Sequence, residues 1–167
     1  TTASWNTAVG FNSMPISSGE QNAAVGANSL LLNTTGIKNV AVGAGALENN
    51  TTGSFNTGVG QDALLNNISG FRNIGIGWNA KFGDSSYHNI RLGYGVGSSL
   101  TGGGNHDNTF IGGYQTAWNA NQKVQPVHQI VIGSLAYGIR DSSVVLGDSA
   151  AIKETYLAGK VTIGNRT

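Results

Sequence analysis

A short phrase recurs along this chain. It ends in a strand-sized run that begins with Asn and closes with Gly: "NTAVG" at 6–10, "NAAVG" at 22–26, "NVAVG" at 39–43 and "NTGVG" at 56–60. The interval between these runs is 16 or 17 residues. A unit of this length cannot bury its own apolar face, so neighbouring units must stack to make a core. The repeat therefore predicts a solenoid.

The repeat can be followed almost to the end of the chain through the Gly that closes each run. The residue before this Gly is always Val, Ile or Leu, and the residue four positions before it is Asn in the first seven units. Turns rich in Asn and Gly, such as "NTTGIKN" at 33–39, separate the runs, and both residues tolerate left-handed backbone at corners. We therefore predict an all-β fold: a β-solenoid or β-roll of about ten short coils, with Asn ladders between them. The closing glycines are Gly10, Gly26, Gly43, Gly60, Gly77, Gly93, Gly112, Gly133, Gly147 and Gly164.

The alternation of side chains along a strand assigns two faces to each run. Val40 and Val42 share one face, and the mainly apolar character of this pair along the units leads us to expect that it forms the core. Asn39 and Ala41 share the other face, where small residues indicate close approach of another backbone. We expect neighbouring chains to meet there. A thin single-chain core is marginal, which also favours a cyclic oligomer.

The composition excludes several classes of partner. Charged residues make up only 10% of the chain and the net charge is +1, so electrostatics predict no nucleic-acid partner. No run of 18 apolar residues is present, so we expect no membrane insertion. The absence of Cys excludes disulfides and thiol chemistry. We expect no cofactor. The chain begins in the middle of its pattern, which suggests a piece of a longer protein.

The pattern "NTAVGxxAL…NTTG…N" resembles the repeat of phage tail-fibre shafts, strongly over 4–80 and moderately over 129–167. It is more distantly similar to the heads of trimeric autotransporter adhesins, whose unit is shorter. The segment "LGDSAAIKETYLAGKVTIGNRT" at 146–167 resembles the stretch that precedes a self-cleaving intramolecular chaperone of the endosialidase type. Similar chaperone-matured fibres occur as adhesive trimers on predatory bacteria. The resemblance implies an elongated extracellular homotrimer, in a virion tail fibre or a bacterial surface fibre.

The repeat loses its regularity in the middle of the chain. The intervals between closing glycines lengthen to 19 and 21 residues, and long Gly-rich or polar segments appear at 95–108 and 114–129. Insertions in solenoids map to loops on one face, often the binding face. We therefore divide the chain into a regular shaft at 1–77, an elaborated head at 78–128, and terminal repeats at 129–167 that precede a removed or absent chaperone.

Aromatic and His residues gather in the head region. Aromatic rings with polar neighbours can stack on sugar rings, so we predict a receptor-binding fibre tip that attaches to a cell-surface ligand, a glycan in the first instance. Candidate ligand-binding residues are Trp118, Tyr114, Tyr94, Tyr87, His88, His106, Asp107, Asn119, His128 and Arg91. Packing in a wider core or a subunit seam is the competing role for Trp118 and Tyr114, and the favoured one for Trp78.

Other functions stay open. Glycoside hydrolysis needs two carboxylates about 5–9.5 Å apart, so a tailspike-like polysaccharide depolymerase would use Asp84, Asp107 or Asp141 at a subunit seam. No spacing requires this, and we assign no catalytic residue. A purely structural fibre spacer is a further alternative. His88, His106 and His128 could ring a threefold axis and hold a metal, but their spacing matches no metal motif, so we predict no metal.

Overall fold

The computed structural model describes residues 5–81, 83–96, 104–113, 128, 130–133 and 144–146. It is a β-solenoid, as the repeat predicted, and its strands are three residues long. Across these ranges no helix is long and apolar enough to cross a membrane. The strands are β1 (Thr7–Val9), β2 (Ala23–Val25), β3 (Val40–Val42), β4 (Thr57–Val59), β5 (Ile74–Ile76), β6 (Ile90–Leu92), β7 (Thr109–Ile111), β8 (Ile130–Ile132) and β9 (Val144–Leu146).

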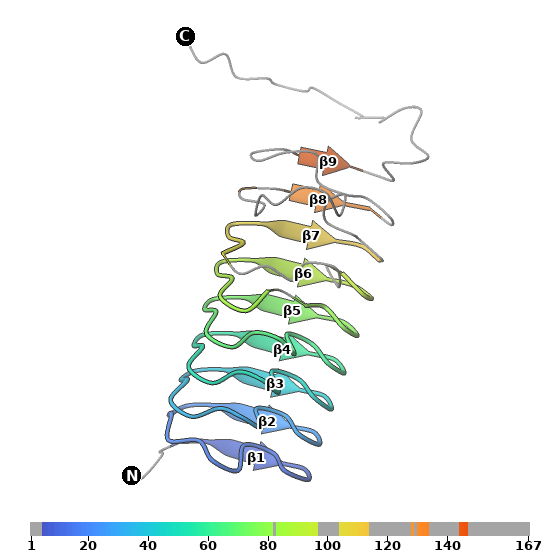
Figure 1. Ribbon diagram of the computed structural model, residues 1–167. Coiled ribbons are helices and arrows are strands. Elements are labelled where there is room, and N and C mark those ends of the chain that lie inside the picture. The colour runs from blue at the N-terminus through green and yellow to red at the C-terminus, as the bar shows by residue number, and fades with distance from the viewer. Residues whose placement is uncertain are drawn as a thin grey trace.

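These strands form one parallel sheet in chain order, with each strand hydrogen-bonded to the next (Figure 1). The register places equivalent residues over one another, for example Ala24 beside Ala41 and Gly75 beside Arg91. Parallel strands lie about 4.8 Å apart, so nine strands span roughly 40 Å along the stack. The sheet continues in the same register from the regular shaft at 1–77 through β6 and β7, so the region predicted as a head keeps the strand of the shaft.

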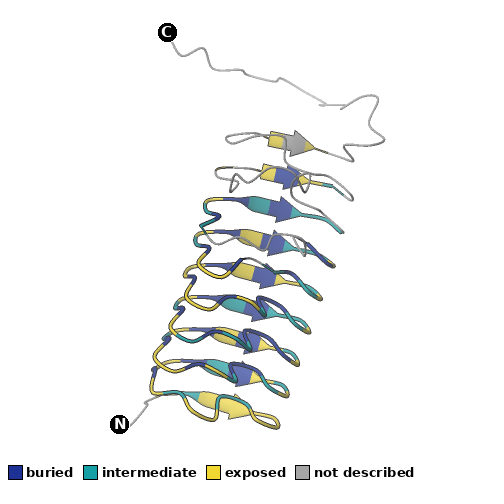
Figure 2. Ribbon diagram, viewed as in Figure 1, coloured by how far each residue is buried: buried dark blue, intermediate teal, exposed yellow. Residues whose placement is uncertain are grey.

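The assignment of the two faces from sequence was wrong. The middle residue of each strand from β2 to β8 points inward and is buried, as for Ala41 at 0% exposure. The residues on either side point outward: Val40 and Val42 are each 39% exposed. Buried and exposed residues alternate in the same way in the neighbouring strands (Figure 2). The apolar pairs expected to form the core therefore lie on the surface.

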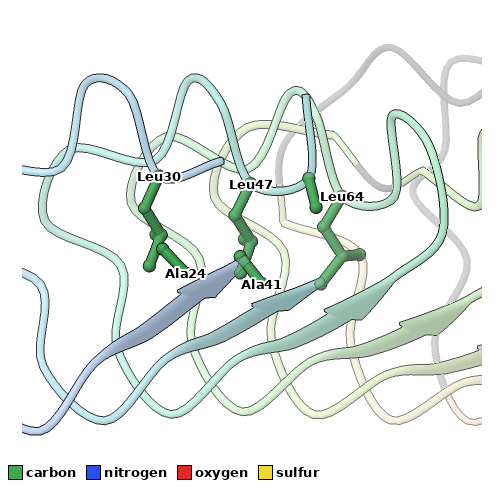
Figure 3. Close-up of a cluster of buried hydrophobic side chains, with 6 residues drawn as sticks. Ala24, Leu30, Ala41, Leu47 and Leu64 are labelled. Carbon is green, nitrogen blue, oxygen red and sulfur yellow. The ribbon is translucent and has the colours of Figure 1, made fainter. Parts of the chain in front are cut away.

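The small inward residues are explained by what lies opposite them. Leu30, Leu47 and Leu64 are fully buried and reach from the facing wall towards the strands (Figure 3). A Cβ added to Gly58 would lie 3.4 Å from Cγ of Leu47. The coil is so thin that a Leu on one wall leaves room for only Ala or Gly on the other, because protein interiors pack without spare volume.

In the next two coils the inward residue of the strand is large. Arg91 and Phe110 occupy the inward position of β6 and β7, and both side chains are completely buried. The Arg91 guanidinium carbon lies 4.9 Å from the centre of the Phe110 ring, and Nη1 donates to the Val96 carbonyl at 3.2 Å. Removal from water disfavours the charged form and lowers the pKa of Arg91 to about 9. The position equivalent to Leu64 is Lys81 in the following coil, so a large residue faces inward where the Leu is lost.

The Asn four positions before each closing Gly forms the predicted ladder. Asn56 is fully buried, and its backbone N–H donates to Oδ1 of Asn39 at 3.0 Å. Its own Oδ1 accepts the N–H of Asn73 at 3.0 Å, and its Nδ2 donates to the Gly70 carbonyl at 2.8 Å. Each amide thus links three coils and satisfies a backbone N–H that would otherwise be buried without a partner.

A second Asn column runs along the turn after the short segment. Nδ2 of Asn50 donates to Oδ1 of Asn33 at 2.8 Å, and Nδ2 of Asn67 donates to Oδ1 of Asn50 at 3.0 Å.

The Gly that closes each strand is required by its backbone conformation and by the next coil. Gly43 has φ of 130°, and a Cβ there would lie 2.5 Å from the Gly60 carbonyl oxygen in the next coil. These contacts fix the corners of the coil.

Candidate functional site

Two residues before each strand from β1 to β8, the chain turns through a corner with left-handed backbone. The residues at this corner, which we call the corner column, have φ between 54° and 61° although none is Gly. From Lys38 to His128, each is held by a backbone hydrogen bond to the coil before it, as in His88 N–H to the Phe71 carbonyl at 3.1 Å. These bonds offset the cost of left-handed backbone, about 1–2 kcal/mol for each residue. The corner column is Trp5, Gln21, Lys38, Phe55, Arg72, His88, Asp107 and His128.

A stack of rings lies beside the corner column, one residue earlier in the chain. The rings of Phe71 and Tyr87 are 5.1 Å apart and nearly parallel, at 4°. The rings of Tyr87 and His106 are 4.7 Å apart at 8°. Parallel bridges join the backbones of the same residues in consecutive coils. The solenoid therefore orders three flat rings, and Phe71 at one end of the stack is 38% exposed.

Three imidazoles converge on the carboxylate of Asp107. His88 Nδ1 lies 3.3 Å from Oδ1, whereas His106 Nδ1 at 2.9 Å and His128 Nε2 at 3.5 Å both face Oδ2. The hydrogen bond from His106 is the main cause that holds the pKa of Asp107 below its ordinary value, with a smaller contribution from His88. Partial desolvation opposes this shift. The cluster thus holds an ionised carboxylate among rings that can donate protons or bind a cation.

The contact with Arg72 determines the tautomer of His88. Its Nη1 lies 3.2 Å from Nε2 of His88. A guanidinium only donates hydrogen bonds, so Nε2 of His88 accepts, and the proton of the neutral ring is on Nδ1, which donates to Asp107. A chain of hydrogen bonds therefore runs along the corner column from Arg72 through His88 to Asp107.

A second aromatic pair follows the closing Gly, at the other end of the strands. The rings of Trp78 and Tyr94 stack 4.7 Å apart at 19°, and they are 38% and 52% exposed. The backbone N–H of Gly95 donates to the Trp78 carbonyl at 2.8 Å. The described part of the upper coils thus presents exposed rings at both ends of the strands.

The structure brings together half of the candidate ligand-binding residues. All five contribute to the corner column or to the ring stack beside it, and their side chains contact one another. They are Tyr87, His88, His106, Asp107 and His128.

The remaining candidates are elsewhere. Tyr94 lies with Trp78 at the far end of the strand. The prediction that Arg91 binds the ligand was wrong, because its side chain is buried inside the coil and cannot reach a ligand on the surface. Trp118, Tyr114 and Asn119 fall outside the described residues.

Sequence reasoning missed two members of the corner, Phe71 and Arg72. They lie in the last coil before the irregular region, outside the predicted head at 78–128. The signal was available in the repeat, because they occupy the positions of Tyr87 and His88 one coil earlier. Aligning coils by these two positions would have shown the column of rings.

The outward residues of the strands form a continuous surface, which we call the apolar sheet face. All 18 positions of this surface, two in each of nine strands, are Thr, Ala, Val, Ile or Leu. Several are markedly exposed, with Ile76 at 41%, Ile130 at 42% and Val144 at 65%. The largest apolar patch of a typical monomer is about 300–600 Å², and larger exposed patches are typical of interaction sites.

Comparison with known proteins gives no relative: no family model, no curated protein and no solved structure matches this chain.

Proposed function

We propose that this chain is part of an extracellular attachment fibre, in a virion tail or on a bacterial surface, in which three copies pack their apolar sheet faces around a common axis. The upper coils of the fibre then bind a cell-surface glycan. The assembly is supported by one observation above all, the apolar sheet face.

The area of this face suits a stable interface. At on the order of 60 Å² for each partly exposed side chain, nine strands offer roughly 1,000 Å² per chain, which a trimer divides between two neighbours. Three chains would together bury about 3,000 Å², more than the roughly 1,200–2,000 Å² of a standard two-chain complex. No charged residue interrupts the stripe. A second and a third copy are the partners of matching length and chemistry, and cyclic symmetry covers every face without leaving one exposed. The resemblance to trimeric fibres agrees with three copies.

Glycan binding is supported by the exposed rings at both ends of the strands. Trp78 and Tyr94 present an amphipathic aromatic surface, and sugars stack on such rings through their apolar C–H faces. Arg72 and Asp107 supply charged hydrogen-bonding groups near the ring stack at the other end of the strands. Three such sites on one fibre would gain avidity from simultaneous contact.

Binding is better supported than hydrolysis. A glycosidase requires one carboxyl group that stays protonated as the general acid, together with a second carboxylate. Asp107 is surrounded by imidazoles, and its pKa is lowered, which keeps it ionised. Asp84 is exposed, and Asp141 lies outside the described residues.

Light scattering coupled to gel filtration tests the assembly. We expect three times the 17.2 kDa of one chain. Ile76→Asp should dissociate the complex, because each interface would bury an unpaired carboxylate. Asn66→Asp, an exposed position away from the strands, is the matched control and should leave the mass unchanged. A wild-type monomer would contradict the proposal.

A glycan array tests the ligand. Trp78→Ala and Tyr94→Ala should each weaken binding to the glycans that the wild type retains. The control is Phe11→Ala, which removes an equally placed ring, 76% exposed, from the first coil. Equal loss with all three variants, or no loss with any, would remove the upper coils as the binding site.

A further inference from the structure

We propose that one ring nitrogen each of His106 and His128, together with the carboxylate of Asp107, forms a binding site for a borderline divalent transition-metal ion such as Zn²⁺, and that His88 positions Asp107 for this role. The site belongs to a single chain and lies on the corner column. It is separate from the apolar sheet face and does not depend on the assembly proposed above.

The three side chains are already close to a coordinating arrangement. Their ligand atoms lie within 4.8 Å of one another. In a tetrahedral site two ligands at about 2.1 Å from Zn²⁺ lie about 3.4 Å apart, so the widest separation must close by roughly 1.4 Å. His128 is 59% exposed and can rotate to do so.

The repeat explains why the ligands gather. Asp107 and His128 hold the same corner position in consecutive coils, and His106 precedes Asp107 on the same corner. Coils separated by about 4.8 Å place equivalent side chains at nearly the spacing of two ligands on one ion. The left-handed backbone is held by hydrogen bonds, including His128 N–H to the His106 carbonyl at 3.2 Å. Residues far apart in sequence are therefore fixed in one small volume.

Groups around these three side chains orient them. His88 donates to Oδ1 of Asp107, and Arg72 fixes the tautomer that allows this. An ion bound at Oδ2 replaces the hydrogen bond that His106 Nδ1 makes to this oxygen. The Tyr87 ring stacks on His106 and restricts its rotation. Hydrogen bonds and packing of this kind orient metal ligands, and their loss typically lowers affinity about 10–100-fold.

The donor set selects the class of ion. Two imidazoles and one carboxylate suit Zn²⁺, Ni²⁺, Cu²⁺ and Co²⁺, whereas Mg²⁺ and Ca²⁺ prefer oxygen ligands alone. Three protein ligands leave a fourth tetrahedral position for water or for an oxygen of a bound molecule. Because imidazole must be neutral to bind a metal, affinity should fall towards acid pH.

Calorimetry and elemental analysis of the full chain test the site with the metal salts alone. We expect one Zn²⁺ per chain, saturable binding in wild type, and no comparable binding of Mg²⁺. His106→Gln and His128→Asn should each lower the affinity at least tenfold, while His88→Gln should lower it less. Asp84→Asn removes an exposed carboxylate outside the cluster and should change nothing. Ile76→Asp should keep full affinity, since the ligands come from one chain.

A spectroscopic readout on the wild type covers the case in which a His variant fails to fold. Zn²⁺ should shift the ring ¹⁵N resonances of His106 and His128 at one equivalent, with a smaller change at His88. Absence of saturable Zn²⁺ binding, or binding that leaves these resonances unchanged, would overturn the proposal. Affinity that survives both ligand variants in folded protein would overturn it as well, because the histidines would then form only a hydrogen-bonded cluster around Asp107.

Discussion

Leu64 occupies the space that a side chain at Gly75 would need: a Cβ added to Gly75 would lie 2.6 Å from Cδ2 of Leu64 and 3.0 Å from the Ala80 carbonyl oxygen. The two residues come from opposite walls of the coil and share one fixed width. A large side chain on one wall therefore requires a small one on the other, which decides which residues can face inward. A residue as large as Arg91 faces inward only where the facing Leu is lost.

The first prediction concerns this pair. Gly75→Ala should lower the free energy of unfolding by about 1–3 kcal/mol, because the added methyl group overpacks the coil. Leu64→Ala alone should cost about 2–5 kcal/mol. The double variant should lose less than the sum of the two, since each change relieves the other. Denaturant unfolding measures all three. Gly58→Ala, where the nearest Leu carbon is 3.4 Å away, is the control and should cost less; additive losses at Gly75 and Leu64 would contradict the relation.

The second prediction concerns the Asn ladder. Asn56→Ala should lower the free energy of unfolding by about 2–4 kcal/mol, because it leaves the Asn73 N–H buried without its partner and removes one of the two hydrogen bonds to the Gly70 carbonyl. Asn66→Ala removes an exposed amide from the neighbouring turn and should stay within about 0.5 kcal/mol of wild type. Thermal and urea unfolding followed by circular dichroism would compare the two. Similar stabilities would mean that the ladder contributes little.

The third prediction concerns the buried Arg91. Arg91→Met should leave stability unchanged or raise it by about 1–2 kcal/mol, because an apolar side chain of similar length avoids burying a charge. Arg91→Ala should instead lower it by several kcal/mol through the cavity that it leaves beside Phe110. Lys38→Met, at an exposed cation, controls for loss of positive charge. The urea concentration at the midpoint of unfolding, measured at pH 7 for the wild type and each variant, tests this prediction. If Met proves as damaging as Ala, the guanidinium contacts with Phe110 and Val96 stabilise the coil more than its desolvation costs.

The fourth prediction concerns acid stability. The pKa of Asp107 is lower in the folded chain than its ordinary value, so the unfolded chain takes up this proton first as the pH falls. The stabilisation by Asp107 should therefore be complete above about pH 5, decrease as the pH drops below the unfolded pKa of about 3.9, and vanish below the folded pKa. The side chain is 38% exposed, so solvent screening should keep the effect small.

Its measurement is the difference in unfolding free energy between wild type and Asp107→Asn from pH 7 to pH 2. The difference should shrink on acidification. Asp84→Asn supplies the comparison for loss of an exposed carboxylate. The charged or titratable side chains facing Asp107 in the described coils are His88, His106 and His128, and Arg72 acts through His88. A difference that grows towards low pH would contradict the sign of the shift.

Much of the fold could be predicted from the repeat. The interval of 16 or 17 residues predicted stacked coils, and the Asn at the fourth position before Gly predicted the ladder. The Asn- and Gly-rich turns predicted where the corners lie, but the left-handed residue of each corner is one such as Lys38 or Phe55 and not Asn or Gly. Each of these features depends on chemistry within one or two neighbouring coils, which a sequence displays directly. The candidate site was predicted in part for the same reason: Tyr87, His88 and Asp107 were singled out because the pattern changes around them.

Alternation showed which residues share a face, and it could not show which face is inside. Val40 and Val42 have the composition of a core, yet Ala41 lies in the interior because Leu side chains from the far wall fill the coil. That outcome depends on the distance between two walls, and no local pattern encodes it. No local pattern encodes the cluster around Asp107 either, because its residues come from three different coils. The sequence by itself determined the period, the corners and the ladders, since these are local; only the tertiary structure decided that the apolar sheet face is outside and that the histidines meet, because both follow from how the coils stack and close.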